Sequence, residues 1–228
     1  MGETIEFASN GSRAQGYLAV PASGHGPGVI VIQEWWGVNP HIRDVVERLA
    51  AEGFVALAPD HYRGAVTTEP DEAGKLMLGL QIATVAKDLA GAASALTSLP
   101  SVDGDRIGAV GFCMGGGLAL LAPTVSDAIV CTSAFYPATP WPDYAPNWSR
   151  YAGKTALINK AEADEPRQGP AIASYAEQIT AHGGTVIIEE YAGSQHAFFN
   201  DDRPEVYDAV HSERAWRLTL ELFHSCIG

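Results

Sequence analysis

The chain has 228 residues, of which 46% are hydrophobic, and this length and composition predict one domain with a full apolar core over residues 1–228. Its formal net charge of −13 disfavours nucleic acid and anionic membrane surfaces as partners. It has no secretory signal pattern and no apolar stretch near the roughly 20 residues of a membrane span. The three cysteines lack disulfide or metal spacing, so we expect reduced thiols in a cytoplasmic protein.

Short strands and helices alternate along the chain. We expect strands at 4–7, 13–20, 29–32, 54–58, 107–110, 128–133, 155–158 and 185–190. Between and after them we expect helices at 40–52, with Asn39 as N-cap, over most of 71–99 with a break near 74–79, and at 117–121, 170–182 and 204–226. Residues 135–151, rich in Pro, Trp and Tyr, are expected to form a covering loop.

This alternation predicts a mainly parallel twisted sheet with helices on both faces, preceded by a hairpin with its turn at residues 9–11. The continuously apolar run 29–32 is typical of a strand that is buried on both faces. In open sheets of this kind, functional residues lie at the carboxyl ends of the strands. Reactive side chains are therefore expected in the segments that follow the strands.

The segment Gly111-Phe112-Cys113-Met114-Gly115 follows one of these strands and leads into a helix-compatible run. This is the context of the nucleophile elbow, with Cys in place of Ser. The turn is strained, and flanking glycines leave room where a Cβ would obstruct it. A helix N-terminus favours a thiolate and a nearby oxyanion. The alternative is that the glycines only let a helix pack on the sheet, with Cys113 as a small buried hydrophobic residue.

A cysteine nucleophile needs a base, and the base needs an orienting acid. Of the seven histidines, His196 alone lies in a short loop after the last expected strand. The acid should follow the strand at 155–158, where Asp164 is the preferred candidate, with Glu162 and then Glu165 as alternatives. It would hold the histidine in the productive tautomer. Each of these side chains could instead be an ordinary structural or solvated group.

Three motifs together resemble the dienelactone hydrolase family of cysteine α/β-hydrolases, which open enol-lactones: Gln-Glu-x-x-Gly-Val-Asn at 33–39, Gly-x-Cys-x-Gly-Gly at 111–116 and Gly-x-x-His-x-Phe at 193–198. The resemblance covers essentially the whole chain and implies an α/β-hydrolase fold. It also implies Cys113 as nucleophile, Asp164 as acid and His196 as base. The oxyanion hole would then be the backbone N–H groups of Trp35 and Met114, as the physics of such sites also suggests.

Glu34 matches the family's characteristic glutamate, which contacts the nucleophilic cysteine in the resting enzyme. A carboxylate near a thiol disfavours the thiolate, so Glu34 is suited to a gating role. Its alternative role is that of a structural partner for an arginine. Ala161 stands where the family's acid segment commonly has a glycine, and this departure weakens the assignment of Asp164.

The arginines with which dienelactone hydrolases anchor a substrate carboxylate have no counterpart at either expected position, 67–70 or 199–202. We therefore expect neutral esters or lactones to be preferred, unless Arg63 or Arg203 turns into the pocket. Aromatic side chains after the strands are expected to line a mostly apolar acyl or lactone pocket. The residues proposed for substrate contact are Trp36, Tyr62, Tyr136, Trp141 and Phe198.

The sequence thus predicts a hydrolase that cleaves a small-molecule carboxylic ester or lactone through an acyl-thioester on Cys113, with no metal or organic cofactor. The alternative is a non-hydrolytic ligand-binding or thiol-redox protein on the same scaffold, because one fold can carry many functions. The retained order of Cys113, Asp164 and His196 favours hydrolysis.

Overall fold

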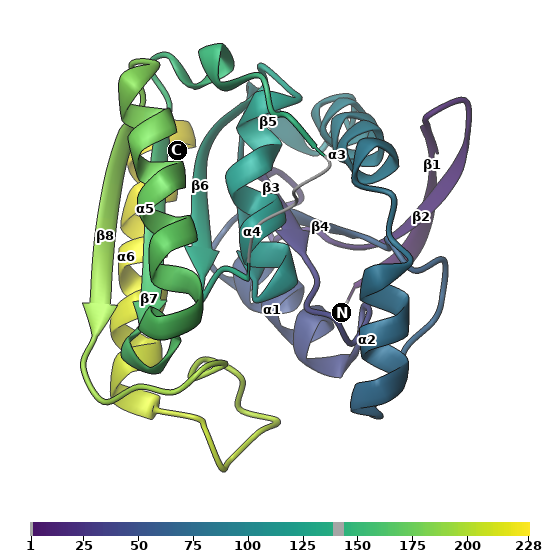
Figure 1. Ribbon diagram of the computed structural model, residues 1–228. Helices are drawn as coiled ribbons and strands as arrows, with labels where there is room; N and C mark the ends of the chain where they lie inside the picture. Colours follow the sequence, from purple (N-terminus) through teal and green to yellow (C-terminus); the bar gives the residue numbers. More distant parts are fainter. Residues whose placement is uncertain (1, 139–143) are drawn as a thin grey trace.

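In the computed structural model, which describes residues 2–138 and 144–228, an eight-stranded sheet runs through the molecule (Figure 1). Its order is β1-β2-β4-β3-β5-β6-β7-β8. The strands are β1 (Glu3–Ser9), β2 (Ser12–Ala19), β3 (Gly26–Ile32), β4 (Val55–Pro59), β5 (Val102–Phe112), β6 (Ile129–Phe135), β7 (Thr155–Ala161) and β8 (Thr185–Tyr191). β2 pairs antiparallel with β1 and β4, and every other pairing is parallel. The expected hairpin and mainly parallel sheet are confirmed.

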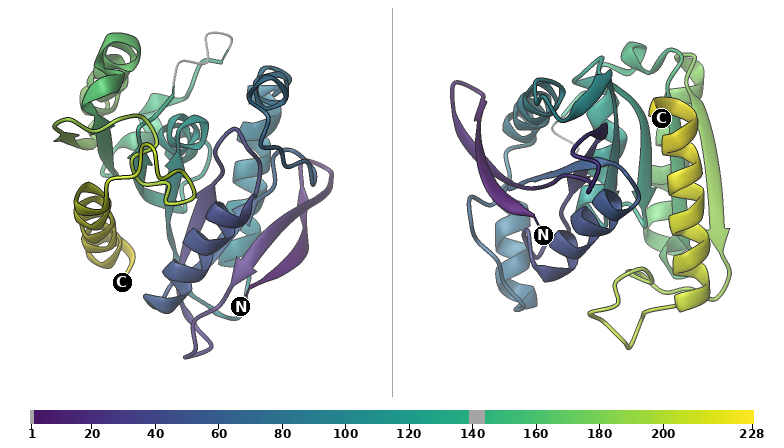
Figure 2. Two further views of the ribbon diagram at one scale, coloured as in Figure 1. Left: turned by 90° about the horizontal axis from the view of Figure 1, so that it is seen from below. Right: turned by 180° about the vertical axis from the view of Figure 1, so that it is seen from behind.

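Six α-helices in the described residues cover the two faces of the sheet (Figures 1 and 2). They are α1 (Pro40–Ala51), α2 (Pro70–Leu78), α3 (Ile82–Thr97), α4 (Met114–Leu121), α5 (Glu165–Ala181) and α6 (Ala209–Ile227). Helices α3, α4 and α5 lie on one face, and α1 and α6 on the other. No single helix in the described ranges is long and apolar enough to cross a membrane; α2 and α3 together, bent by 86°, would be so by length and composition only.

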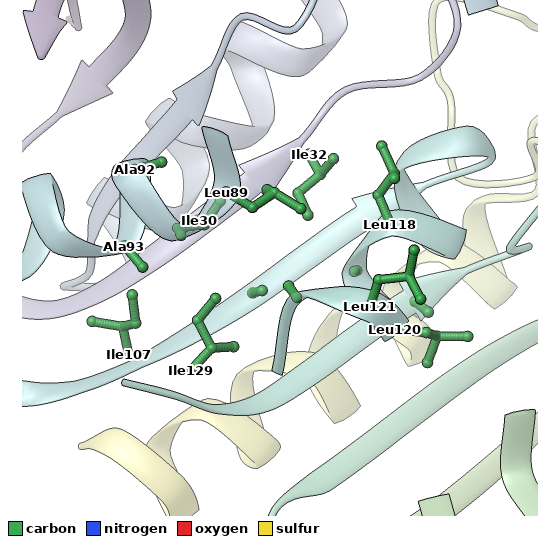
Figure 3. Packing of buried hydrophobic residues seen from close by; sticks show 14 of the residues in the cluster. Ile30, Ile32, Leu89, Ala92, Ala93, Ile107, Leu118, Leu120, Leu121 and Ile129 are labelled. Carbon is green, nitrogen blue, oxygen red and sulfur yellow. The ribbon is translucent and has the colours of Figure 1, made fainter. Parts of the chain in front are cut away.

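The central strand β3 explains why there are two cores. Its side chains alternate, so that Ile30 and Ile32 pack with α3 and α4 (Figure 3), while Val29 and Val31 pack with α1 and α6. All four are fully buried. A strand covered on both faces needs no polar side chain at either alternate position, which is why its sequence reads as one apolar run.

Several helix boundaries differ from those expected: α4 begins at Met114 rather than at 117, and the break between α2 and α3 lies at 79–81 rather than near 74–79. Asn39 caps α1 as expected, because its Oδ1 accepts the Ile42 N–H at 3.1 Å. α5 begins at Glu165 rather than at 170, because Pro166 lies in the first turn, where a missing N–H costs no hydrogen bond. α6 begins at Ala209 rather than at 204, because Asp208 accepts the His211 N–H at 3.0 Å and caps the helix there.

Candidate active site

Cys113 lies between the last residue of β5 and the first residue of α4, with φ of 54° and ψ of −116°. Positive φ is uncommon for a residue with a side chain and marks local strain. The end of β6 and the residues after it hold this conformation: the Cys113 N–H donates to the carbonyl of Phe135, the last residue of β6, at 3.1 Å, and the Cys113 carbonyl accepts from the Ala138 N–H at 2.8 Å. The strained turn leaves the Cys113 side chain partly exposed at the carboxyl edge of the sheet.

The glycines of the elbow are required by close backbone contacts. A Cβ at Gly111 would collide with the carbonyl of Gly115, and a Cβ at Gly115 would collide with the carbonyls of Ile32 and Gln33. α4 can therefore approach β3 only because these positions lack side chains. The glycines therefore allow the helix to pack closely on the sheet, as the alternative interpretation proposed. They also allow the strained turn of the elbow.

His196 follows β8, and its Nδ1 lies 2.7 Å from Oδ2 of Asp164. The desolvation of the partly buried ring lowers its pKa, but interactions with Asp164 and Cys113 outweigh that effect and raise the pKa of His196 to about 10. Because Nδ1 is engaged by the carboxylate, Nε2 is the ring nitrogen left to face the thiol. The structure therefore brings together the three residues that the sequence selected for catalysis.

The two other candidate acids are engaged elsewhere. Oε2 of Glu162 accepts the backbone N–H of Gly193 at 2.6 Å, and Glu165 forms an ion pair with Lys160. Glu162 thus fixes the loop that leads to the histidine, while Asp164 contacts the imidazole itself. The presence of Ala161 in place of the family's usual glycine has not displaced Asp164 from His196.

The carboxylate of Glu34 is buried, with 1% of the residue exposed, and it is held by two neutral donors. Tyr136 Oη donates to Oε1 at 3.3 Å, and Asn200 Nδ2 donates to Oε2 at 2.9 Å. Within the described residues, no hydrogen bond joins Glu34 to Cys113 and no arginine pairs with it. The conformation thus shows neither the resting contact that the resemblance implied nor the arginine partner of the alternative reading.

Asn200 is the functional candidate that sequence reasoning missed. It lies in the same loop as His196, four residues further on, and is almost fully buried. The sequence signal was present, since Asn200 falls in the segment where the family carries an anchoring arginine. Only the folded loop shows that its amide turns toward Glu34.

The two backbone groups expected to form the oxyanion hole lie at the same edge of the sheet as Cys113. Met114 begins α4, so its N–H has no acceptor within the helix. Trp35 follows the end of β3, whose Ile32 pairs in register with Gly111 on β5. This pairing brings the start of the Trp35 loop beside the elbow.

The aromatic residues divide between a cavity wall and the core. Trp36 is partly exposed and lines a cavity of about 400 Å³. Tyr62 is buried, with Oη 3.4 Å from Sδ of Met114, and Tyr136 is buried against the His196 ring with centroids 5.1 Å apart. Phe198 is fully buried among Phe135, Tyr136 and Tyr191, so its expected substrate contact is corrected to a packing role. Trp141 lies outside the described residues.

A strained turn from strand to helix carries the nucleophile candidate, and the acid and histidine follow later strands in that order. Together with the mainly parallel sheet, this arrangement defines an α/β-hydrolase. A model of the dienelactone hydrolase family matches residues 14–227, and the chain belongs to that family. It is accordingly a hydrolase that acts on carboxylic ester or lactone bonds.

Three similar proteins illustrate the relationship. "Protein usf" of Aquifex pyrophilus is 34% identical over 230 residues, and "Putative carboxymethylenebutenolidase" of Aquifex aeolicus is 31% identical over 230 residues; both alignments cover 98% of each chain. The crystal structure of a "Putative Dienelactone Hydrolase" from Klebsiella pneumoniae superposes with a TM-score of 0.83 at 26% identity. That match covers 98% of this chain and 99% of the other.

Proposed function

We propose that this hydrolase opens a small ester or lactone through a covalent acyl-thioester on Cys113, with His196 as base and acid and Asp164 as its orienting carboxylate. The observation that carries the proposal is the 2.7 Å contact between His196 Nδ1 and Asp164 Oδ2, at the same edge of the sheet as the Cys113 elbow. The raised pKa of His196 favours the imidazolium, which supports a cysteine that gives up its proton to this histidine.

In the first half of the proposed reaction, the Cys113 sulfur attacks the substrate carbonyl carbon and a C–S bond forms. The N–H groups of Trp35 and Met114 stabilise the resulting oxyanion. Collapse of this intermediate breaks the C–O bond, and His196 gives its proton to the departing oxygen. In a lactone, that oxygen remains attached to the acyl group, so the ring is opened.

In the second half, water attacks the thioester while His196 accepts one of its protons. The C–S bond then breaks, the carboxylic acid leaves and the cysteine–histidine pair is restored. Asp164 keeps Nδ1 protonated throughout, which holds Nε2 toward the reacting atoms. Glu34 modulates the thiol by turning between its present donors and Cys113.

Intact mass measurement tests this mechanism directly. A slowly hydrolysed ester should add one acyl mass to the wild-type protein, and Cys113→Ala should show neither the adduct nor turnover. Cys131→Ala and Cys226→Ala are the matched controls and should retain both, since neither cysteine belongs to the proposed site. Acyl labelling or turnover that persists in Cys113→Ala would overturn the assignment. A protein that binds the ester without any turnover would be the non-hydrolytic alternative.

A further inference from the structure

The cavity of about 400 Å³ beside Glu34 is built by three loops at the carboxyl edge of the sheet. Trp36 comes from the loop after β3, Val66 and Thr67 come from the loop after β4, and Asn200 and Arg203 come from the loop after β8. The Thr67 N–H donates to the Trp36 carbonyl at 3.2 Å and so ties two of the loops together. The third loop is tied in by the Asn200 hydrogen bond to Glu34.

This cavity is connected to the proposed catalytic residues through direct contacts. Asn200 is in its wall and hydrogen-bonds Glu34, which also accepts from Tyr136; the Tyr136 ring in turn packs against His196. On the other side, Trp36 follows Trp35, whose N–H is proposed for the oxyanion hole. Cys113 and His196 are not among the residues that line the cavity, so a substrate whose carbonyl lies at Cys113 occupies it only if its acyl chain extends past Trp36 and Asn200.

The charges around the cavity are mainly negative. Arg203, one of the two arginines that could reverse the expected preference, does line the cavity and is the one cation among its described residues. Its Nε and one terminal nitrogen each lie 2.9 Å from Oε1 of Glu205, which neutralises it. Asp202 is a second lining charge, and the Glu34 carboxylate lies behind Asn200. One arginine thus stands against three carboxylates. Within the described lining, no cation is left to meet a substrate carboxylate without competition.

We propose that this cavity receives the uncharged acyl portion of the substrate, and that Asp202 and the Arg203–Glu205 pair make the enzyme select neutral esters or lactones over substrates that carry a carboxylate. The inference rests on the proposed function, because it assumes that the reacting carbonyl lies at Cys113. An acyl chain packs on Trp36 and Val66, while Thr67 and Asn200 supply neutral polar contacts.

A carboxylate that entered the cavity would lose part of its hydration and would meet like charges, and both effects oppose binding. Glu205 is 60% exposed as a side chain, so its pairing with Arg203 is screened and can be broken. The expected discrimination is therefore graded rather than absolute. We expect a preference of about tenfold in kcat/KM for the neutral form.

The probes are para-nitrophenyl hydrogen succinate and para-nitrophenyl methyl succinate, which share the leaving group and differ in the charge of the acyl chain. The wild-type enzyme should hydrolyse the methyl ester with about tenfold higher kcat/KM than the free acid at low ionic strength. Added salt should reduce the difference, because salt screens charges near the surface. Equal or faster hydrolysis of the free acid by the wild-type enzyme would overturn the proposal.

Two variants test whether these particular carboxylates cause the preference. Glu205→Gln frees Arg203 and Asp202→Asn removes a lining charge, so each should improve the free acid relative to the methyl ester by about threefold. The matched control is Glu221→Gln, which removes a carboxylate that pairs with Arg217 on exposed α6. It should leave the ratio unchanged. An equal change in all three variants, or no change in any of them, would overturn the proposal.

The two proposals can fail separately. If Cys113→Ala abolishes hydrolysis of both succinates while the wild type treats them equally, the cysteine mechanism stands and the substrate preference is wrong. If Cys113→Ala still hydrolyses the methyl ester, the cysteine mechanism is wrong, and the charge preference fails with it because it assumes that site.

Discussion

Asn200 donates a 2.9 Å hydrogen bond from Nδ2 to Oε2 of Glu34, across 166 positions of sequence. The amide is oriented by a second bond, because its Oδ1 accepts the Asp202 N–H at 3.1 Å. The loop that carries His196 thereby holds the carboxylate that follows β3. Since that carboxylate has no cation partner among the described residues, its position depends on two neutral donors, Asn200 and Tyr136.

Asn200→Ala should release Glu34 to turn toward Cys113. A carboxylate closer to the thiol disfavours the thiolate, which is the form that iodoacetamide alkylates. We expect the alkylation of Cys113 in the free enzyme to slow by about threefold, and Glu34→Gln to accelerate it. In the double variant, the asparagine change should have almost no effect. If Asn200→Ala slowed the alkylation of Cys113 equally in the wild-type and the Glu34→Gln backgrounds, Asn200 would act only as a structural residue.

The alkylation assay needs one background change. A hydrogen bond with Cys131 lowers the pKa of the partly exposed Cys226 thiol to about 7, although desolvation opposes the change. Cys226 will therefore compete for the reagent near neutral pH. The parent protein, Asn200→Ala, Glu34→Gln and the double variant should therefore all carry Cys226→Ser. Peptide mapping should then report the label on Cys113 alone.

Asp164→Asn should move the basic limb of the pH profile of kcat/KM. Burial lowers the pKa of His196, and its hydrogen bond to the Asp164 carboxylate is the largest of the effects that raise it to about 10. Without that acceptor, the imidazole should lose its proton at a pH lower by about one pH unit or more. kcat should also fall about a hundredfold or more. Glu162→Gln is the matched control, and a basic limb that moves equally in both variants would contradict the role of Asp164.

The interaction between His196 and Asp164 should also affect the stability of the fold over a defined pH range. The pKa of His196 in the folded protein, about 10, lies above its ordinary value of 6.5. Its contribution to stability is therefore fully present below pH 6.5 and is lost as the pH rises through about 10. The Tm difference between the wild type and Asp164→Asn should be large near pH 6.5 and should shrink toward pH 10. A difference that stays constant over this range would contradict the assignment.

The sequence predicted the sheet, the elbow at Cys113 and the order of acid and histidine, because these features depend on local patterns. Apolar runs, helix caps and glycine spacings each involve residues that are close together in the sequence, so they can be recognised without knowledge of the fold. It could not show that Asn200 binds Glu34, because that contact depends on how two distant loops meet. Phe198 was misplaced for the same reason: an aromatic residue after a strand can face the cavity or the core, and packing against Tyr191 and Phe135 decides it.

Gly115→Ala and Gly74→Ala should change stability in opposite directions. A Cβ at Gly115 would collide with the carbonyls of Ile32 and Gln33, and neither backbone group can move without disturbing β3. A Cβ at Gly74, inside α2, has no neighbour within 4 Å, and alanine favours the helix by about 0.5–1 kcal/mol.

We therefore expect Gly115→Ala to reduce the free energy of unfolding by about 3 kcal/mol, and Gly74→Ala to raise it slightly. Urea titration measures both, with unchanged m values as evidence that only stability has changed. Gly115→Ala should also lose ester hydrolysis under conditions where it stays folded, because α4 and the Met114 N–H must shift away from β3. Stability and activity within experimental error of the wild type would mean that α4 does not pack as closely on β3 as the elbow requires.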